Sequence, residues 1–261
     1  MTMSKQQDMR FPVTLIQCSN LERVDLDTLF QNSLIYGDWL EVVLVVPENH
    51  PRKVLPINSQ IKIAYDQHAG IYEAMNLGLQ IATQEFVIFV NDDDILVKNF
   101  AEVLGRTFFD ASQKLDLIEF KTQFIGEEFM RFEEFKDFRA LKRGQMPTSH
   151  QGQLWRRQKL IELGGFKTKL VGSMPITLRI AADLEVYLAA MDSGIDKKQQ
   201  DEILTLTSHG GYSELNIDRR YLEVAAILSQ RRIIPLVFFV KFWIEFRILN
   251  FFRRLFILGK D

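Results

Sequence analysis

Short apolar runs alternate with amphipathic stretches along the first half of the chain. Each run is long enough for a strand buried on both faces of a sheet. The expected strands are residues 13–18, 40–46, 61–65 and 86–90. Apolar residues at helical spacing predict an amphipathic helix over 71–82, and 26–36 is a second helix candidate. Because strands alternate with helices, the pattern predicts an α/β fold with a mostly parallel central sheet.

The second half of the chain has a less regular pattern. It predicts a strand over 115–120 and a helix over 180–188, whereas 129–143 is charged and aromatic without a clear period. Residues 233–258 are dense in Phe, Ile, Leu and Trp, with charges every few residues. No uninterrupted apolar window there reaches the ~18 residues that a spanning helix needs. We therefore predict an amphipathic helical tail in a membrane interface, with a core or oligomer-facing helix as the alternative.

Three consecutive acids follow the apolar run 86–90, in the sequence Asn91-Asp92-Asp93-Asp94. These carboxylates cannot continue into the interior, because an unpaired buried charge is very costly. We expect them at the carboxyl edge of the sheet, where ligands bind in open α/β sheets. Such oxygen donors suit Mg²⁺ or Mn²⁺, and these metals commonly carry substrate phosphates. The alternative is a helix start, with Asp94 capping a helix over 100–109.

Composition and charge narrow the class of protein. The chain of 261 residues can form one large domain, or one domain with an appendage. Its single cysteine, Cys18, cannot form an intramolecular disulfide, and the polar residues 1–10 do not resemble a signal peptide. We therefore expect a cytoplasmic location.

The net charge of −2 hides an asymmetry along the chain. Residues 229–261 contain seven basic and two acidic residues, so they carry +5 and leave −7 for the remainder. This asymmetry predicts an anionic partner for the tail, and we expect peripheral attachment to the inner face of the cell membrane. The acidic body, which lacks a basic aromatic groove, argues against nucleic-acid binding.

Two blocks of sequence carry more specific motifs. Residues 70–76 read Gly-Ile-Tyr-Glu-Ala-Met-Asn, and an apolar strand and the acid cluster follow them. This block resembles the nucleotide-sugar-binding half of family 2 glycosyltransferases, which typically read Glu-x-Asp-x-Gly-Ile-Tyr-Asp-Ala-Met-Asn, with Asn-Ser-Asp-Asp closing the strand. The second block has His-Gln at 150–151, Gly-Gly-Phe at 164–166 and Ile-Ala-Ala-Asp at 180–183. It is similar to the acceptor-side half of the same family, and two blocks in the right order are more specific than either alone.

The resemblance implies a GT-A-type fold and an inverting, metal-dependent glycosyltransferase. Such an enzyme would move a sugar from a nucleotide-diphosphate donor to a saccharide acceptor, which we expect to be lipid-linked, in surface polysaccharide biosynthesis. It implies a catalytic domain over 11–215, made of a nucleotide-sugar-binding half (11–110) and an acceptor-side half (111–215). The tail then spans 216–261.

The resemblance also assigns roles to single residues. Asp183 matches the family's catalytic base, and its alternative is a helix N-terminal acid. Asp93 and Asp94 would hold Mn²⁺ or Mg²⁺. The positions expected to bind the donor are Asn20, Asp66, His68, Glu73, Asn76, Asn91 and Asp92. Those expected on the acceptor side are His150 and Gln151. Glu73 and Asn76 have an alternative, which is to brace the loop-to-helix junction.

Two positions depart from the family pattern. The family's second strand usually ends in an Asp that contacts the nucleoside, whereas this chain has Pro47-Glu48. The Asp two residues before Gly-Ile-Tyr is His68 here. Both changes bear on which nucleotide is bound, and two other functions stay open. A nucleotidyltransferase would be expected to carry a glycine-rich basic loop near the first strand, which residues 19–23 do not provide. A membrane-associated scaffold with a degenerate donor site would be non-catalytic.

Overall fold

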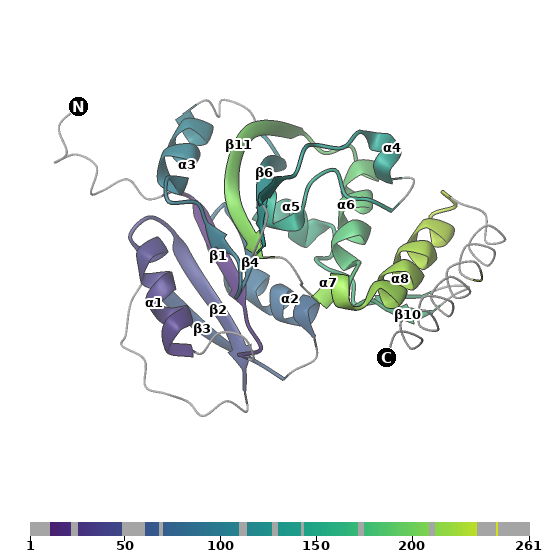
Figure 1. The fold of residues 1–261 in the computed structure, drawn as a ribbon, viewed down its shortest axis with the longest axis horizontal. Coiled ribbons are helices and arrows are strands. Elements are labelled where there is room, and N and C mark those ends of the chain that lie inside the picture. Colours follow the sequence, from purple (N-terminus) through teal and green to yellow (C-terminus); the bar gives the residue numbers. More distant parts are fainter. Residues whose placement is uncertain are drawn as a thin grey trace, which may run out of the picture.

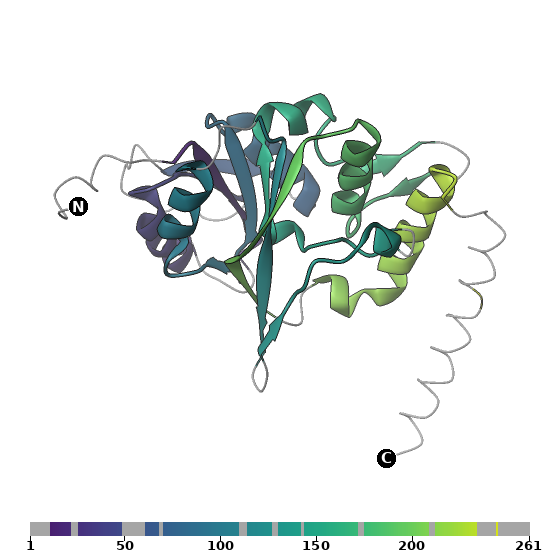
Figure 2. The same cartoon turned by 90° about the horizontal axis from the view of Figure 1, so that it is seen from above.

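A computed structural model describes residues 11–21, 26–48, 61–67, 70–109, 114–126, 130–141, 144–171, 175–208, 212–233 and 244. Nine strands of these segments form one sheet through the middle of the molecule (Figure 1). In Figure 2, α1 (purple) lies on one side of this sheet, and α6 and α8 (green to yellow-green) lie on the other. The fold confirms the predicted α/β architecture with a mostly parallel central sheet flanked by helices.

The sheet has the order β3-β2-β1-β4-β8-β6-β11-β5, with β7 paired to β6. Its strands are β1 (Val13–Cys18), β2 (Glu41–Pro47), β3 (Ile61–Asp66), β4 (Phe86–Asn91), β5 (Ile95–Leu96), β6 (Leu117–Ile125), β7 (Met130–Phe132), β8 (Gln153–Arg156) and β11 (Lys197–Ser208). The strands β3, β2, β1 and β4 are parallel, as the alternation of strands and helices predicts. Two short strands, β9 (Lys169–Leu170) and β10 (Ile176–Thr177), pair separately.

The structure confirms the helices predicted over 26–36 and 71–82 in the first half and over 180–188 in the second half. They are α1 (Leu26–Gly37), α2 (Ile71–Ile81), α3 (Phe100–Phe109), α4 (Phe138–Leu141), α5 (Arg157–Glu162), α6 (Ala182–Asp192), α7 (Tyr212–Leu215) and α8 (Ile217–Gln230). A single 3₁₀ turn, His150–Gly152, leads into β8. The sequence pattern predicts neither β8 nor β11. One is only four residues long, and the other begins with an exposed polar half that hides its period.

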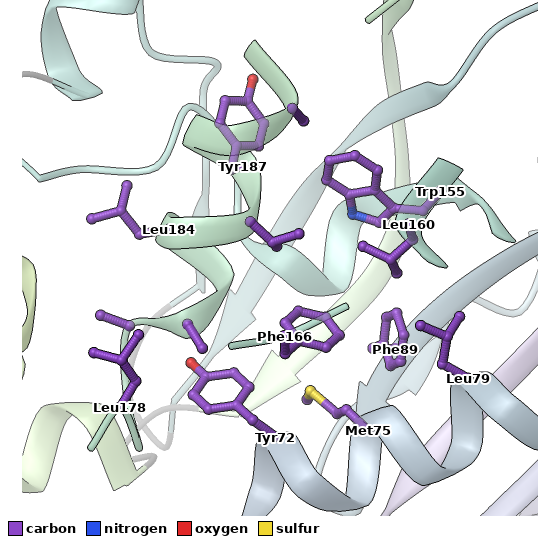
Figure 3. Packing of buried hydrophobic residues seen from close by; sticks show 14 of the residues in the cluster. Tyr72, Met75, Leu79, Phe89, Trp155, Leu160, Phe166, Leu178, Leu184 and Tyr187 are labelled. Atoms are coloured by element: carbon purple, nitrogen blue, oxygen red, sulfur yellow. The ribbon is translucent and has the colours of Figure 1, made fainter. Parts of the chain in front are cut away.

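Each face of the sheet has its own hydrophobic core, because side chains alternate along every strand. On β1, Leu15 faces the core beneath α1 and α3, and Ile16 faces the core beneath α2 and α6. Figure 3 shows the second core, where aromatic rings from distant segments meet. Phe166 stacks on Tyr72 at 5.6 Å between ring centroids and meets Phe89 edge-on at 5.0 Å. This core therefore fixes α2 and the segments around α6 relative to each other.

The predicted tail helix falls almost wholly outside the described residues. Helix α8 precedes it and buries Ala226, Ile227 and Leu228 in the core shared with α2 and α6. Across the described ranges, none of the helices has the length and hydropathy needed to cross a bilayer. The domain boundary after residue 215 stays a prediction.

Candidate active site

An open cavity with a volume of about 840 Å³ lies at the carboxyl ends of the parallel strands. The last residues of four strands line it: Cys18 of β1, Pro47 of β2, Asp66 of β3 and Asn91 of β4. Parallel strands end at one edge of the sheet, so residues far apart in the chain meet there. Parts of α2, α6, α7 and α8 line the cavity opposite them.

Most of the residues that the sequence nominates share this cavity. Its lining includes Asn20, Asp66, Asn91, Asp92, Asp93, Asp94, His150, Gln151 and Asp183. Glu73 and Asn76 are not among the lining residues, and His68 lies outside the described part of the chain. The structure therefore brings the two sequence blocks together, and the roles of the individual residues stay predictions.

The acid turn after β4 is tied to the end of β1. The Ser19 hydroxyl donates to Asp92 Oδ2 at 2.6 Å and accepts the Leu21 N–H at 2.9 Å. Leu21 has φ +60°, a left-handed conformation that is uncommon for a leucine. The Asp92 carboxylate thus holds the loop after β1 in the shape that puts Asn20 at the cavity.

Asp94 is the buried centre of the acid turn, with 1% of its surface exposed. Its carboxylate accepts Asn91 Nδ2 at 3.0 Å, Gln151 Nε2 at 3.1 Å and the Ser208 N–H at 3.0 Å. These bonds join the ends of β4 and β11 to the turn before β8. The prediction that Asp94 caps the helix over 100–109 is wrong, because β5 separates Asp94 from α3.

Burial raises the pKa of Asp94 above its ordinary value, and the neighbouring charge of Asp93 raises it further. The hydrogen bonds from the Ser208 N–H and Gln151 act in the opposite direction, because they favour the ionised form. Asp94 is therefore a carboxylate whose oxygens are already engaged by protein donors.

Asp93 sits differently from Asp94, because its side chain is only partly buried and lines the cavity. Its backbone carbonyl accepts the Ser208 hydroxyl at 2.7 Å. Across the described ranges, no three His, Cys, Asp or Glu side chains are arranged to hold a metal by themselves. One or two carboxylates together with substrate phosphates are a common way of holding Mg²⁺, and the residues present fit that arrangement.

Asp183 lies in the first turn of α6 and lines the same cavity as the acid turn. The Tyr72 hydroxyl donates to Asp183 Oδ1 at 3.1 Å, and His150 Nδ1 lies 3.7 Å from Oδ2. Burial and the nearby Asp183 charge raise the pKa of Tyr72 well above 10, so this phenol stays a hydrogen-bond donor. With 17% of its side chain exposed, Asp183 is held by neighbours yet reachable from the cavity.

The turn that carries His150 and Gln151 depends on a close backbone approach. Gly152 lies against the carbonyl oxygen of Phe120, and a Cβ at that position would overlap this oxygen. A glycine therefore lets the 3₁₀ turn pass close to β6 and present both side chains to the cavity.

Asn76 forms a brace between the two motif blocks. Its Nδ2 donates to the Phe166 carbonyl at 2.8 Å, and its Oδ1 accepts the Phe166 N–H at 2.9 Å. Gly165, with φ +65°, has no room for a Cβ beside Asn76 Oδ1. These contacts support the bracing alternative for Asn76 rather than a contact with a donor.

Several cavity residues escape sequence reasoning. Thr207 and Ser208 come from the end of β11, and Arg179, Arg220 and Tyr221 come from the segments around α6 and α8. The Gly-Ile-Tyr motif marks Tyr72, but nothing local in the sequence indicates that its hydroxyl meets a carboxylate 111 residues away.

Comparisons with known proteins bear on this site. No family model matches the chain. Curated relatives include the PGL/p-HBAD biosynthesis glycosyltransferases of Mycobacterium bovis and Mycobacterium tuberculosis. Each is 23% identical over 198 residues, covering 72% of this chain and 70% of the relative.

Solved structures of glycosyltransferases share the fold. S. aureus TarS 1–349 in complex with UDP-GlcNAc has 17% identity and a TM-score of 0.58, covering 85% of this chain and 67% of TarS 1–349. This chain spans 66% of the length of another TarS 1–349 structure. Mannosyltransferase PcManGT from Pyrobaculum calidifontis, in complex with GDP-Man and Mn²⁺, has 16% identity and a TM-score of 0.52, covering 84% of this chain and 67% of its own. The shared fold confirms the predicted GT-A-like fold, and the similarity to these relatives supports the prediction of a glycosyltransferase.

Proposed function

We propose that this protein is an inverting, metal-dependent glycosyltransferase that uses a nucleotide-sugar donor and a saccharide acceptor. The observation that carries the proposal is the cavity that strand-end carboxylates share with Asp183, itself held by Tyr72. The strand-end carboxylates suit a divalent metal that binds a donor diphosphate, and Asp183 suits an acceptor hydroxyl. The relatives' chemistry, with UDP-GlcNAc on TarS and GDP-Man on PcManGT, supports a sugar donor of this kind.

On the donor side, Asp93 would hold Mn²⁺ or Mg²⁺ together with the donor phosphates. A bound divalent ion supplies Lewis-acid neutralisation of the charge on the leaving diphosphate. Asp92 and Asp94 serve a different purpose, because their hydrogen bonds to Ser19, Gln151 and Ser208 keep the turn in place. We therefore favour Asp93 as the direct ligand over the pair Asp93 and Asp94.

The nucleoside would lie over the ends of β1, β2 and β3, beside Asn20 and Asp66. Pro47 pairs in register with Asp66, which matches the Glu of the family motif, so a carboxylate residue stands beside the end of β2. This pairing supports donor binding despite the departure at Pro47.

On the acceptor side, Asp183 would accept the proton of the attacking hydroxyl. Sugar hydroxyls are weak nucleophiles, so a positioned base is needed as attack proceeds. Tyr72 holds Oδ1, which leaves Oδ2 on the side of His150. The His150 Nε2 is buried without a hydrogen-bond partner among the described residues, which supports a polar ligand group there. Attack from the face opposite the diphosphate inverts the anomeric centre.

We infer that the acceptor is a lipid-linked saccharide at a membrane surface, and that the enzyme acts in surface polysaccharide biosynthesis. Arg179 and Arg220 line the acceptor wall of the cavity and suit a phosphate between sugar and lipid. Beside them, Tyr212, Leu215 and Ile217 expose apolar side chains. An apolar surface next to basic residues suits peripheral binding to anionic lipid. The basic sequence of 233–258 would add to this attachment.

A screen of nucleotide-sugars with and without Mn²⁺ tests the proposal. A donor that binds the folded state raises the melting temperature, and this rise should need the metal. The donor found should then be turned over with release of nucleoside diphosphate. Release of pyrophosphate from a nucleoside triphosphate and a sugar phosphate would instead indicate the nucleotidyltransferase, and no metal-dependent binding of any nucleotide-sugar would favour the scaffold.

A further inference from the structure

A buried carboxylate on α8 holds the backbone just before Asp183. Glu223 has no exposed surface, and it lies 42 to 44 residues further along the chain than the backbone that it holds. Its Oε2 accepts the N–H groups of Arg179, Ile180 and Ala181 at 3.0, 2.7 and 3.0 Å. Oε1 is also 3.0 Å from the Arg179 N–H. Three successive N–H groups thus converge on one carboxylate.

This contact is placed where it can control the geometry of the site. Ala181 is the N-cap residue directly before α6, and its side chain makes no capping hydrogen bond. Arg179, the first of the three anchored residues, and Asp183, two residues beyond the last, both line the cavity. A buried carboxylate that accepts several backbone N–H bonds is a rigid anchor, because leaving any of these buried donors unpaired is costly.

Arg219 completes the anchor. Its Nε donates to Glu223 Oε1 at 2.8 Å, and its NH2 group donates to the Thr177 carbonyl at 3.2 Å. The guanidinium thereby balances the buried charge of Glu223 and binds the same segment a second time. Helix α8 and the segment 177–181 are therefore joined by a network in which each buried charge has a partner.

We propose that Glu223 is a positioning residue for Asp183. This inference rests on the proposed function, because it concerns the base of that reaction. Glu223 fixes the segment 179–181, and the segment fixes where α6 starts. The direction of the Asp183 carboxylate toward the acceptor hydroxyl follows from that start. Glu223 itself does not line the cavity and does not contact substrate.

The same two helices offer a matched control. Arg231, at the end of α8, binds Glu185 of α6 through Nε and NH2 at 2.7 Å each. Arg231→Gln weakens the contact between α8 and α6 without touching residues 179–181. Glu223→Gln keeps the shape of the side chain but turns one oxygen into an NH2 group that faces backbone donors. Both variants should lower the melting temperature.

The test compares transfer kinetics of the full chain and these variants. Glu223→Gln should lower kcat by roughly 10²-fold, since small misplacements of a reacting group cost about that much. Donor affinity by calorimetry should be unchanged, because Asp93 and Asn20 lie at the other wall. Glu223→Asp, which retains the charge, should recover part of the rate. Arg231→Gln should keep the wild-type kcat.

A double-mutant cycle separates positioning from general loosening of the fold. If Glu223 acts through Asp183, then Glu223→Gln should change the residual rate of Asp183→Asn by no more than about twofold. Equal losses of kcat in Glu223→Gln and Arg231→Gln, or full losses that multiply in the double variant, would overturn the positioning role. A wild-type protein without transfer activity would instead refute the proposed function.

Discussion

Of the three acids after β4, we expect Asp94 to contribute to stability and Asp93 to contribute to binding. Asp94→Ala leaves the Ser208 N–H without its acceptor, and a buried unpaired donor costs about 1–3 kcal/mol. It also removes the bond from Gln151, whose amide lies at the cavity and can turn to water. Burial raises the pKa of Asp94, which means that its buried charge is unfavourable. Removing this carboxylate therefore offsets part of the lost stability. We expect a net loss of about 2–4 kcal/mol in the free energy of unfolding.

That loss corresponds to a melting temperature lower by about 5–15 °C for a chain of this size. Asp93→Ala is the matched control, because its carboxylate lines the cavity and its backbone keeps the bond from the Ser208 hydroxyl. Its melting temperature should change by no more than about 2 °C. Its metal-dependent stabilisation by nucleotide-sugar should disappear, whereas folded Asp94→Ala should retain some.

Differential scanning calorimetry with and without Mn²⁺ and donor measures both effects. An Asp94→Ala protein that melts like the wild type, but no longer responds to metal and donor, would refute this division. Asp94 would then be a metal ligand, and the hydrogen bonds that surround it would contribute little to stability.

Further predictions concern the base, acid stability and the tail. Asp183→Asn still accepts the Tyr72 hydroxyl bond, so donor affinity should hold while the transfer rate falls by roughly 10²–10⁴; near-normal turnover would show that the proton goes elsewhere. Burial would raise the pKa of Glu41, but bonds from Lys62, Thr14 and Thr83 lower it from 4.5 to about 2. Ionised Glu41 thus adds stability above pH 4.5 that is lost as the pH falls toward 2. In urea unfolding, the advantage of wild type over Glu41→Gln should shrink by about 3 kcal/mol across that range, and a constant difference would contradict it. Truncation after residue 233 keeps the Arg231 ion pairs and should abolish flotation with anionic liposomes, since each basic residue near such a surface contributes about 1 kcal/mol; full-length protein that does not float would exclude the membrane role.

The elements of the first half of the chain, and the sheet edge at which its strands end, follow from the sequence pattern alone. The strands 13–18, 40–46 and 86–90 appear where apolar runs predict them, because each run is buried on both faces of the sheet. The strand 61–65 also appears as predicted, although it is only partly buried. The acids lie at the sheet edge because burial of unpaired charge is so costly. Both conclusions rest on local pattern. In parallel βα units, elements that follow one another in the sequence usually also lie next to one another in space.

Which groups meet across the cavity depends on the complete tertiary fold. The short strand β8 enters between β4 and β6 in the antiparallel sense, and this carries Gln151 to Asp94. Tyr72 reaches Asp183 because Phe166 packs α2 against the segments around α6. Glu223 reaches residues 179–181 because α8 docks on that same core. These contacts join residues 42 to 111 positions apart, and no local period encodes them. Their partners depend on the path of the whole chain, since a polar group is buried only where the finished fold supplies its hydrogen bonds.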